Sequence, residues 1–247
     1  MVENFFGWVI DPDRGVQLFS WHHGLYVFFA VLAVFLPLRY ARAIKESVHE
    51  ARFRHWAFVW LLVLEIVYHT HNWMHGMFSL PLHICSFAVV MNLALLKTNS
   101  HKVFEYVFFF GVLGGLMALL IPFTYGFPYY NIRYHLFILM HMTIIVIPLY
   151  YYKAYGFRVN LRATYKTFFM VLLTIPIVFN LNRFFNAVGL SQEPINYWYV
   201  TEIPEHVAFV FGDYHVIYLG AFVSVIYLSQ MILYKVSNRN RNSVSSS

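Results

Sequence analysis

The sequence predicts an all-α, polytopic membrane protein with seven transmembrane helices. Of its 247 residues, 60% are hydrophobic and only 11% are charged, a balance that water-soluble globular domains do not have. Several apolar runs approach the roughly 20 residues that a helix needs to cross a hydrocarbon core about 30 Å thick. The runs also lack the polar face, repeating every ~3.6 residues, that the helices of a soluble bundle would carry.

Seven apolar segments account for the expected spans. They form one transmembrane domain over residues 1–235, followed by a disordered cytoplasmic tail over residues 236–247. The third and sixth segments are short for a complete span. In chain order the segments are Val16–Leu38, His55–Trp73, Pro81–Leu96, Val103–Pro122, Tyr134–Tyr152, Thr167–Leu181 and Val207–Tyr234.

Positive charge predicts the orientation of the chain in the membrane. Most of the 17 Lys and Arg residues follow the first, third, fifth and seventh segments. Because short basic connections stay in the cytoplasm, we expect the N-terminus outside and the C-terminus in the cytoplasm. The net charge of +6 then reflects orientation and attraction to anionic lipids, so no nucleic-acid partner is expected. The oligomeric state is left open.

The histidines gather on one side of the membrane in this orientation. Ten of the 13 fall in the outer half of the spans or at their outer ends. Because polar groups are costly at membrane depth unless they face a bundle interior or water, this distribution predicts a polar cavity that opens outward. For His22, His23, His75 and His206, a position in the interfacial belt is the simpler interpretation.

The second segment places Glu65, His69 and Asn72 on one stripe of a helix. Two interpretations stay open: a hydrogen bond between Glu65 and His69 that supports helix packing, or a functional site. His69, His71 and His75 are spread around most of the helix circumference, so they cannot all face one ion. We therefore expect neither a metal nor a cofactor.

The chain has a single cysteine, Cys85, in the stretch LPLHICSFAVV. Residues two apart on a helix project about 200° apart, so His83 and Cys85 cannot pair in a regular helix. We expect Pro81 in the first turn and Cys85 one turn inside, at nearly the depth of His141 in the fifth segment. A nucleophile with His141 as its base and an inert core cysteine both remain open.

Four segments in order resemble the YwaF-like integral membrane proteins: LPLHICSFAVVMNLALL, EYVFFFGVLGGLMALLIP, YHLFILMHMTIIVIPLYYY and EPINYWYV. The resemblance covers Glu65–Glu205. The eukaryotic branch of this family looks like a group of lipid acyltransferases that use the cysteine of the third-helix segment.

The resemblance therefore implies a membrane-embedded acyltransferase or transacylase that acts on phospholipids and lysophospholipids through a cysteine thioester. It implies that Cys85 carries the acyl chain, with His141 as its base and His83 inside the same LPLHxC motif. Asn196 and Tyr197 match the Asn-Tyr motif. The expected substrate-binding residues are Asn92, Arg133, Asn196, Tyr197, Glu65 and His69.

The outward position of Cys85 and His141 favours a phospholipid as the acyl donor, because acyl-CoA is charged and cytoplasmic. A competing hypothesis is a proton-coupled small-molecule transporter, or a ligand-binding membrane protein, that uses the Glu and His side chains of the cavity. A structural protein without chemistry is the third hypothesis. A covalent retinal protein is disfavoured because Val207–Tyr234 contains no lysine.

Overall fold

The computed structural model describes residues 2–15, 17–122 and 126–242, and every regular element among them is helical. The all-α expectation is therefore confirmed. Two compact units can be distinguished: Met1–His75 with Cys85–Phe157, and Gly76–Ile84 with Arg158–Ser247. The single domain expected over residues 1–235 stays a prediction.

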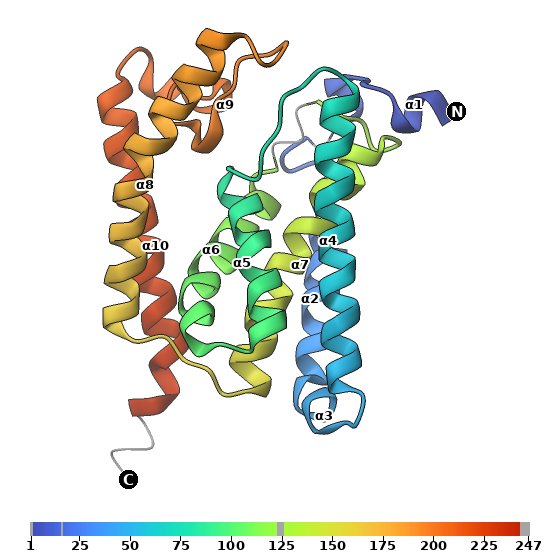
Figure 1. Ribbon diagram of the computed structural model, residues 1–247, viewed down its shortest axis with the longest axis vertical. Helices are drawn as coiled ribbons and strands as arrows, with labels where there is room; N and C mark the ends of the chain where they lie inside the picture. The colour runs from blue at the N-terminus through green and yellow to red at the C-terminus, as the bar shows by residue number, and fades with distance from the viewer. Residues whose placement is uncertain (1, 16, 123–125, 243–247) are drawn as a thin grey trace. The chain divides into compact units, whose positions relative to one another are not determined.

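The first unit contains most of the long helices (Figure 1). Side chains cap three of them, because Ser20, Ser100 and Asn131 each accept a hydrogen bond from a backbone N–H in the first turn that follows. Its elements are α1 (Val2–Phe6), η1 (Pro12–Arg14), α2 (Trp21–Arg39), α3 (Ala41–Glu46), α4 (Glu50–Met74), α5 (Ile84–Thr98), α6 (His101–Leu120) and α7 (Ile132–Ala154).

The second unit is built on α8 (Leu161–Val188) and α10 (His215–Asn242), which run side by side (Figure 1). Asn160 caps the start of α8, and Gly189 ends it at φ 68°, a left-handed conformation that costs glycine little. Two short elements, η2 (Tyr197–Tyr199) and α9 (Glu205–Phe211), lie in the connection between the two long helices.

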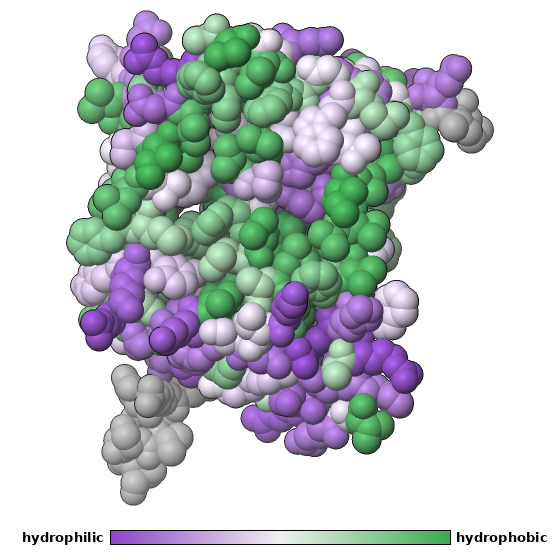
Figure 2. Space-filling model, viewed as in Figure 1, coloured by the Kyte–Doolittle hydropathy of each residue, from purple (hydrophilic) through white to green (hydrophobic). Residues whose placement is uncertain are grey.

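Five helices within the described residues are long and apolar enough to cross a membrane: α2, α6, α7, α8 and residues His215–Arg239 of α10. Helix α5 is apolar but shorter, and α4 carries buried polar residues in its C-terminal half. Hydrophobic side chains cover the middle of the face of the first unit seen in Figure 2, and hydrophilic ones gather where α3 lies. A multi-pass arrangement is thus supported, while seven spans and the orientation of the termini stay predictions.

Three expected boundaries differ in the structure. The segment Val207–Tyr234 is not one helix, because Gly212 adopts φ 51° and separates α9 from α10. The sixth segment is longer than its apolar run, since α8 extends by more than a turn at its polar ends. The first helix starts at Trp21, and Val16, where its apolar run begins, lies outside the described residues.

Residues 236–247 were expected to be a disordered tail, and in the part that the structure describes α10 continues to Asn242. The segment has neither Pro nor Gly, and two of its polar side chains donate to backbone carbonyls. Asn238 Nδ2 donates to the carbonyls of Val159 and Tyr234, both at 3.0 Å, and Ser237 Oγ also donates to Tyr234. Residues 243–247 lie outside the described residues.

Helices α6 and α7 approach each other closely at two glycines. A Cβ atom on Gly111 would collide with the carbonyl oxygen of Ile144, and one on Gly115 would collide with the Ile145 side chain and lie 2.9 Å from the His141 carbonyl oxygen. The spacing of four residues places both glycines on one face of α6, the arrangement that lets membrane helices pack backbone to backbone.

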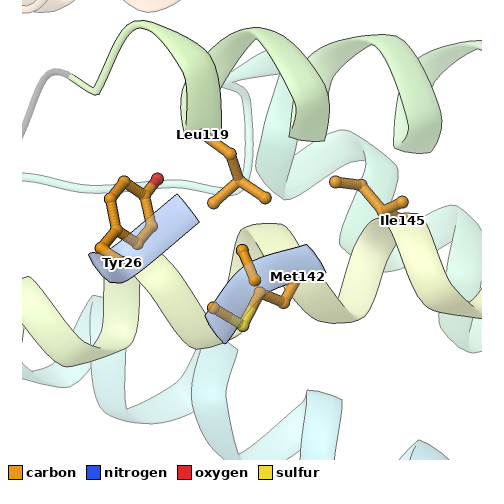
Figure 3. Close-up of a cluster of buried hydrophobic side chains, with 5 residues drawn as sticks. Tyr26, Leu119, Met142 and Ile145 are labelled. Atoms are coloured by element: carbon orange, nitrogen blue, oxygen red, sulfur yellow. The ribbon is translucent and has the colours of Figure 1, made fainter. Parts of the chain in front are cut away.

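Helix α2 covers one side of this pair. Tyr26 and Ala30 of α2 join Leu119 of α6 and Met142 and Ile145 of α7 in a buried apolar cluster. Figure 3 shows that the labelled side chains come from these three helices. Because α6 and α7 already meet through glycine, this cluster fixes the side of α7 that α2 covers.

A polar cluster joins α4, α5 and α7 near α3. Arg54 donates from Nε to Glu50 Oε1 and from Nη1 to the Leu96 carbonyl, both at 2.7 Å. Tyr155 also donates to Glu50 Oε1, at 2.5 Å. Burial, together with this hydrogen bond, raises the pKa of the Tyr155 hydroxyl, so it stays a donor at neutral pH.

We predict that Gly115→Leu destabilises the protein by about 1–3 kcal/mol or more, because the added side chain forces α6 and α7 apart. Gly24→Leu is the control, since a Cβ there meets no other atom within 4 Å. Thermal unfolding in detergent, followed by fluorescence, measures both. Equal melting temperatures for the two variants would contradict the close packing.

Candidate functional site

Cys85 is the second residue of α5, which begins at Ile84. The expectation that Pro81 lies in the first turn is wrong, because residues 81–83 form a turn outside the helix. Hydrogen bonds hold this turn: Leu82 N donates to the Leu80 carbonyl at 2.7 Å, and the Trp198 indole N–H donates to the Leu82 carbonyl at 2.6 Å. The N–H of Cys85 therefore belongs to the first turn of α5, where backbone donors have no partner within the helix.

His141 lies in the interior of α7 and is buried. Its Nδ1 is 2.6 Å from the Phe137 carbonyl oxygen. Because a carbonyl only accepts, Nδ1 carries the hydrogen, and Nε2 keeps the lone pair in the neutral ring. The tautomer that this hydrogen bond selects is the one in which His141 can act as a base through Nε2.

Glu65 of α4 is buried and accepts a hydrogen bond from His69 Nε2, with Oε1 and Nε2 3.0 Å apart. The expected bond between these two residues is confirmed. The other oxygen, Oε2, is buried and has no hydrogen-bond partner among the described residues. Helices α4, α5 and α7 carry Glu65, Cys85 and His141, and all three residues belong to the first unit.

Two other expected site residues of the first unit, Asn92 and Arg133, lie on α5 and α7 at some distance along each helix from Cys85 and His141. Asn92 is fully buried two turns after Cys85, where its Nδ2 donates to the Ala88 carbonyl at 2.8 Å and lies beside Gly111. Its Oδ1 has no partner among the described residues. Arg133 is the second residue of α7, and its Cζ lies 4.0 Å from the centre of the Tyr68 ring.

His83, Asn196 and Tyr197 belong to the second unit. The His83 ring packs edge-on against the Tyr197 ring, with centroids 5.0 Å apart. The Asn196 side chain closes its own loop, because it donates to the Glu202 carbonyl at 2.9 Å and accepts from the Thr201 N–H at 3.1 Å. The Tyr197 hydroxyl accepts from the Leu80 N–H at 2.8 Å. Their catalytic and substrate-binding roles stay predictions.

The motif analysis missed two residues that organise this loop. Asn182 of α8 donates to the Tyr197 carbonyl at 3.0 Å and accepts from the Tyr197 N–H at 3.0 Å. Trp198 adopts φ 60°, an unfavourable conformation for a large side chain, while its indole holds Leu82. Asn182 directly follows the apolar segment Thr167–Leu181, and a polar residue at that position could have indicated a structural role.

The histidines at the end of α4 have partners of other kinds. His71 Nε2 donates to the Phe6 carbonyl at 2.9 Å, and His75 Nδ1 donates to the His71 carbonyl at 2.8 Å. Across the part of the chain that the structure describes, no three His, Cys, Asp or Glu residues converge so that they could hold a metal ion.

The apolar helices and the buried polar residues within them define a multi-pass integral membrane protein. Comparison with protein families matches residues 18–234 to the TMEM164 family, so the chain belongs to the TMEM164 family. No curated protein and no solved structure matches the chain. The likeness to YwaF-like proteins therefore stays a hypothesis.

We predict that Trp198→Phe destabilises the protein by about 1–3 kcal/mol, because the Leu82 carbonyl loses its donor. Limited proteolysis should then cut between residues 76 and 83 sooner than in the wild type. Trp56→Phe is the control, since Trp56 is 62% exposed. The same cleavage rate in both variants would show that the indole does not hold this turn.

Proposed function

We propose that this chain is a membrane-embedded lipid acyltransferase or transacylase that carries an acyl chain on Cys85, with His141 as the base. One observation carries the proposal: a hydrogen bond from Nδ1 to the Phe137 carbonyl leaves Nε2 of the buried His141 with its lone pair, in the same unit whose helix α5 holds Cys85 in its first turn. A cysteine that only fills space needs none of these features.

The first half of the reaction transfers the acyl chain to the enzyme. His141 Nε2 takes the proton of the Cys85 thiol, and the thiolate attacks the ester carbonyl of a phospholipid. The C–O bond of the ester breaks, and the leaving lysophospholipid oxygen takes the proton from His141. A thioester and a lysophospholipid are formed.

The second half reverses these roles. A lysophospholipid hydroxyl gives its proton to His141 Nε2 and attacks the thioester carbonyl. The C–S bond breaks, the Cys85 thiolate recovers the proton, and a new ester leaves. Water in place of the hydroxyl would give hydrolysis.

Both halves pass through a tetrahedral intermediate with a negative oxygen. The first-turn N–H groups of α5, at Cys85 and its neighbours, are the backbone donors closest in the chain to the sulfur, and they lie at the positive end of the helix dipole. The Asn92 and Asn196 amides, by contrast, already donate within their own elements. The backbone is therefore the better source of oxyanion stabilisation.

In this mechanism the carboxylate of Glu65 stabilises the imidazolium that forms when His141 holds the proton. His69, bonded to Glu65 Oε1, keeps the carboxylate in place. Glu65 and His69 thus support the base from α4.

We predict that the wild-type protein in nanodiscs transfers a labelled acyl chain from a phospholipid to Cys85 and then to a lysophospholipid. Mass spectrometry detects the labelled Cys85 peptide and the labelled product lipid. Cys85→Ala should abolish both signals, and His141→Gln should lower the rate by about 10²–10⁴-fold, as expected for loss of a general base.

Ser86→Ala is the matched control, because it changes the neighbouring buried residue and leaves the thiol intact. Transfer that survives in Cys85→Ala would remove the cysteine from the mechanism. No transfer by the folded wild type with several lipid classes would favour the transporter hypothesis, in which Cys85 only packs.

We also predict that the acyl donor is a phospholipid and not acyl-CoA, because the expected orientation places Cys85 near the outer face. Vesicles with the protein in one known orientation separate the two. Acyl-CoA supplied on the cytoplasmic side should give no product, whereas labelled phospholipid in the outer leaflet should. Rapid turnover with cytoplasmic acyl-CoA would refute this assignment.

A further inference from the structure

Arg133 is a buried cation without an acidic partner. It is only 7% exposed, at the start of α7. Arg14 and Arg54 each form an ion pair with an acid on their own segment. No Asp or Glu of the described residues lies within ion-pair distance of the Arg133 guanidinium. A buried charge without a partner costs several kcal/mol, so the site calls for an anion.

The hydrogen-bond donors of Arg133 support the same conclusion. A guanidinium has five N–H donors, and within the described part of the chain one of them reaches an acceptor, the Tyr68 carbonyl at 3.4 Å. The rings of Tyr68, Phe127 and Trp8 lie 4.0, 5.3 and 5.8 Å from Cζ. Aromatic faces stabilise the charge, but they leave the in-plane donors available.

His71 provides an independent observation at the same end of α4. Its Nε2 donates to the Phe6 carbonyl, so Nδ1 of the neutral ring is an acceptor, and this atom is buried without a partner. His71 is 5% exposed. The Trp8 and Phe127 rings that surround Arg133 also pack on His71, with centroids 5.8 and 6.5 Å away. His71 Nδ1 and the Arg133 guanidinium therefore lie around the same two aromatic rings.

We propose that Arg133 and His71 bind the phosphate-bearing head group of a lipid. Arg133 contacts the phosphate, whose geometry suits a planar guanidinium, and His71 Nδ1 accepts a hydrogen bond from a hydroxyl or ammonium of the head group. A ligand with both an anionic oxygen and a hydrogen-bond donor satisfies both residues, whereas a fatty acid or an inorganic anion without a donor satisfies Arg133 alone.

This inference deepens the proposed function and rests on it for the identity of the lipid as substrate. His141 follows Arg133 by eight residues on α7, about 12 Å along the helix axis. The phosphate of a phospholipid is joined to its ester groups through glycerol, so a head group held at Arg133 directs the esters toward the depth of His141.

Binding without turnover tests the proposal. The full-length protein in a neutral detergent is titrated with phosphatidylglycerol and with phosphatidylethanol of the same acyl chains, and native mass spectrometry counts bound lipid. The two lipids have the same charge, but phosphatidylethanol has no head-group hydroxyl. We expect the wild type to bind phosphatidylglycerol more tightly.

Arg133→Gln should weaken binding of both lipids by about tenfold or more, because a charged hydrogen bond is lost. His71→Phe should weaken only phosphatidylglycerol, to the level of phosphatidylethanol. Arg14→Gln removes an exposed guanidinium and should leave both affinities unchanged. If Arg133→Gln does not fold, Arg133→Lys replaces it. The binding of both lipids by the wild type is then also compared with the binding of diacylglycerol, which has no phosphate.

Equal binding of diacylglycerol and phosphatidylethanol by the wild type would overturn the phosphate assignment, and so would unchanged binding by Arg133→Gln. Unchanged selectivity in His71→Phe would overturn the role of Nδ1. Binding of sn-glycerol 3-phosphate as tight as that of phosphatidylglycerol would identify a soluble phosphate ester and overturn the lipid. Selective lipid binding by Cys85→Ala, with no acyl transfer by the wild type, would support the site and reject the proposed function.

Discussion

The close contact between α6 and α7 is the constraint on which the first unit depends. Gly111 and Gly115 bring the backbones of the two helices together, and the His141 carbonyl lies directly opposite Gly115. Asn92 of α5 lies against Gly111 at the same contact. Because small residues let membrane helices approach without side chains between them, the depth of His141 is set by backbone packing. The polar residues of the neighbouring helices are placed relative to this pair.

The cost of burying polar groups is a second constraint on this membrane protein. Such groups are expensive in an apolar interior unless they are bonded, and most of those in this chain are. The exceptions among the described residues include Glu65 Oε2, Asn92 Oδ1 and His71 Nδ1, all in the first unit. Atoms of this kind mark positions where a proton, a substrate group or water completes the structure. The proposed head-group site uses one of these three atoms, His71 Nδ1.

Hydrogen bonds with the Tyr197–Trp198 loop hold the residues that precede α5. Leu80 and Leu82 are bonded to Tyr197 and Trp198, whose loop is in turn held by Asn182. In this arrangement the backbone of Trp198 adopts an unfavourable φ of 60°. The hydrogen bonds end two residues before Ile84, so α5 begins there and Cys85 falls in the first turn. In the proposed mechanism, that position supplies free backbone donors next to the sulfur.

The sequence by itself determined the helical class and the multi-pass character, because hydropathy is a local property. It also offered the bond between Glu65 and His69 as one of two interpretations, from their helical spacing, and named Cys85 and Arg133 as candidate site residues without their surroundings. The start of α5 at Ile84 and the aromatic surroundings of Arg133 were decided by the tertiary structure. Each of these depends on which atoms distant or neighbouring segments place beside a residue, and hydrophobic periodicity contains no information about such contacts.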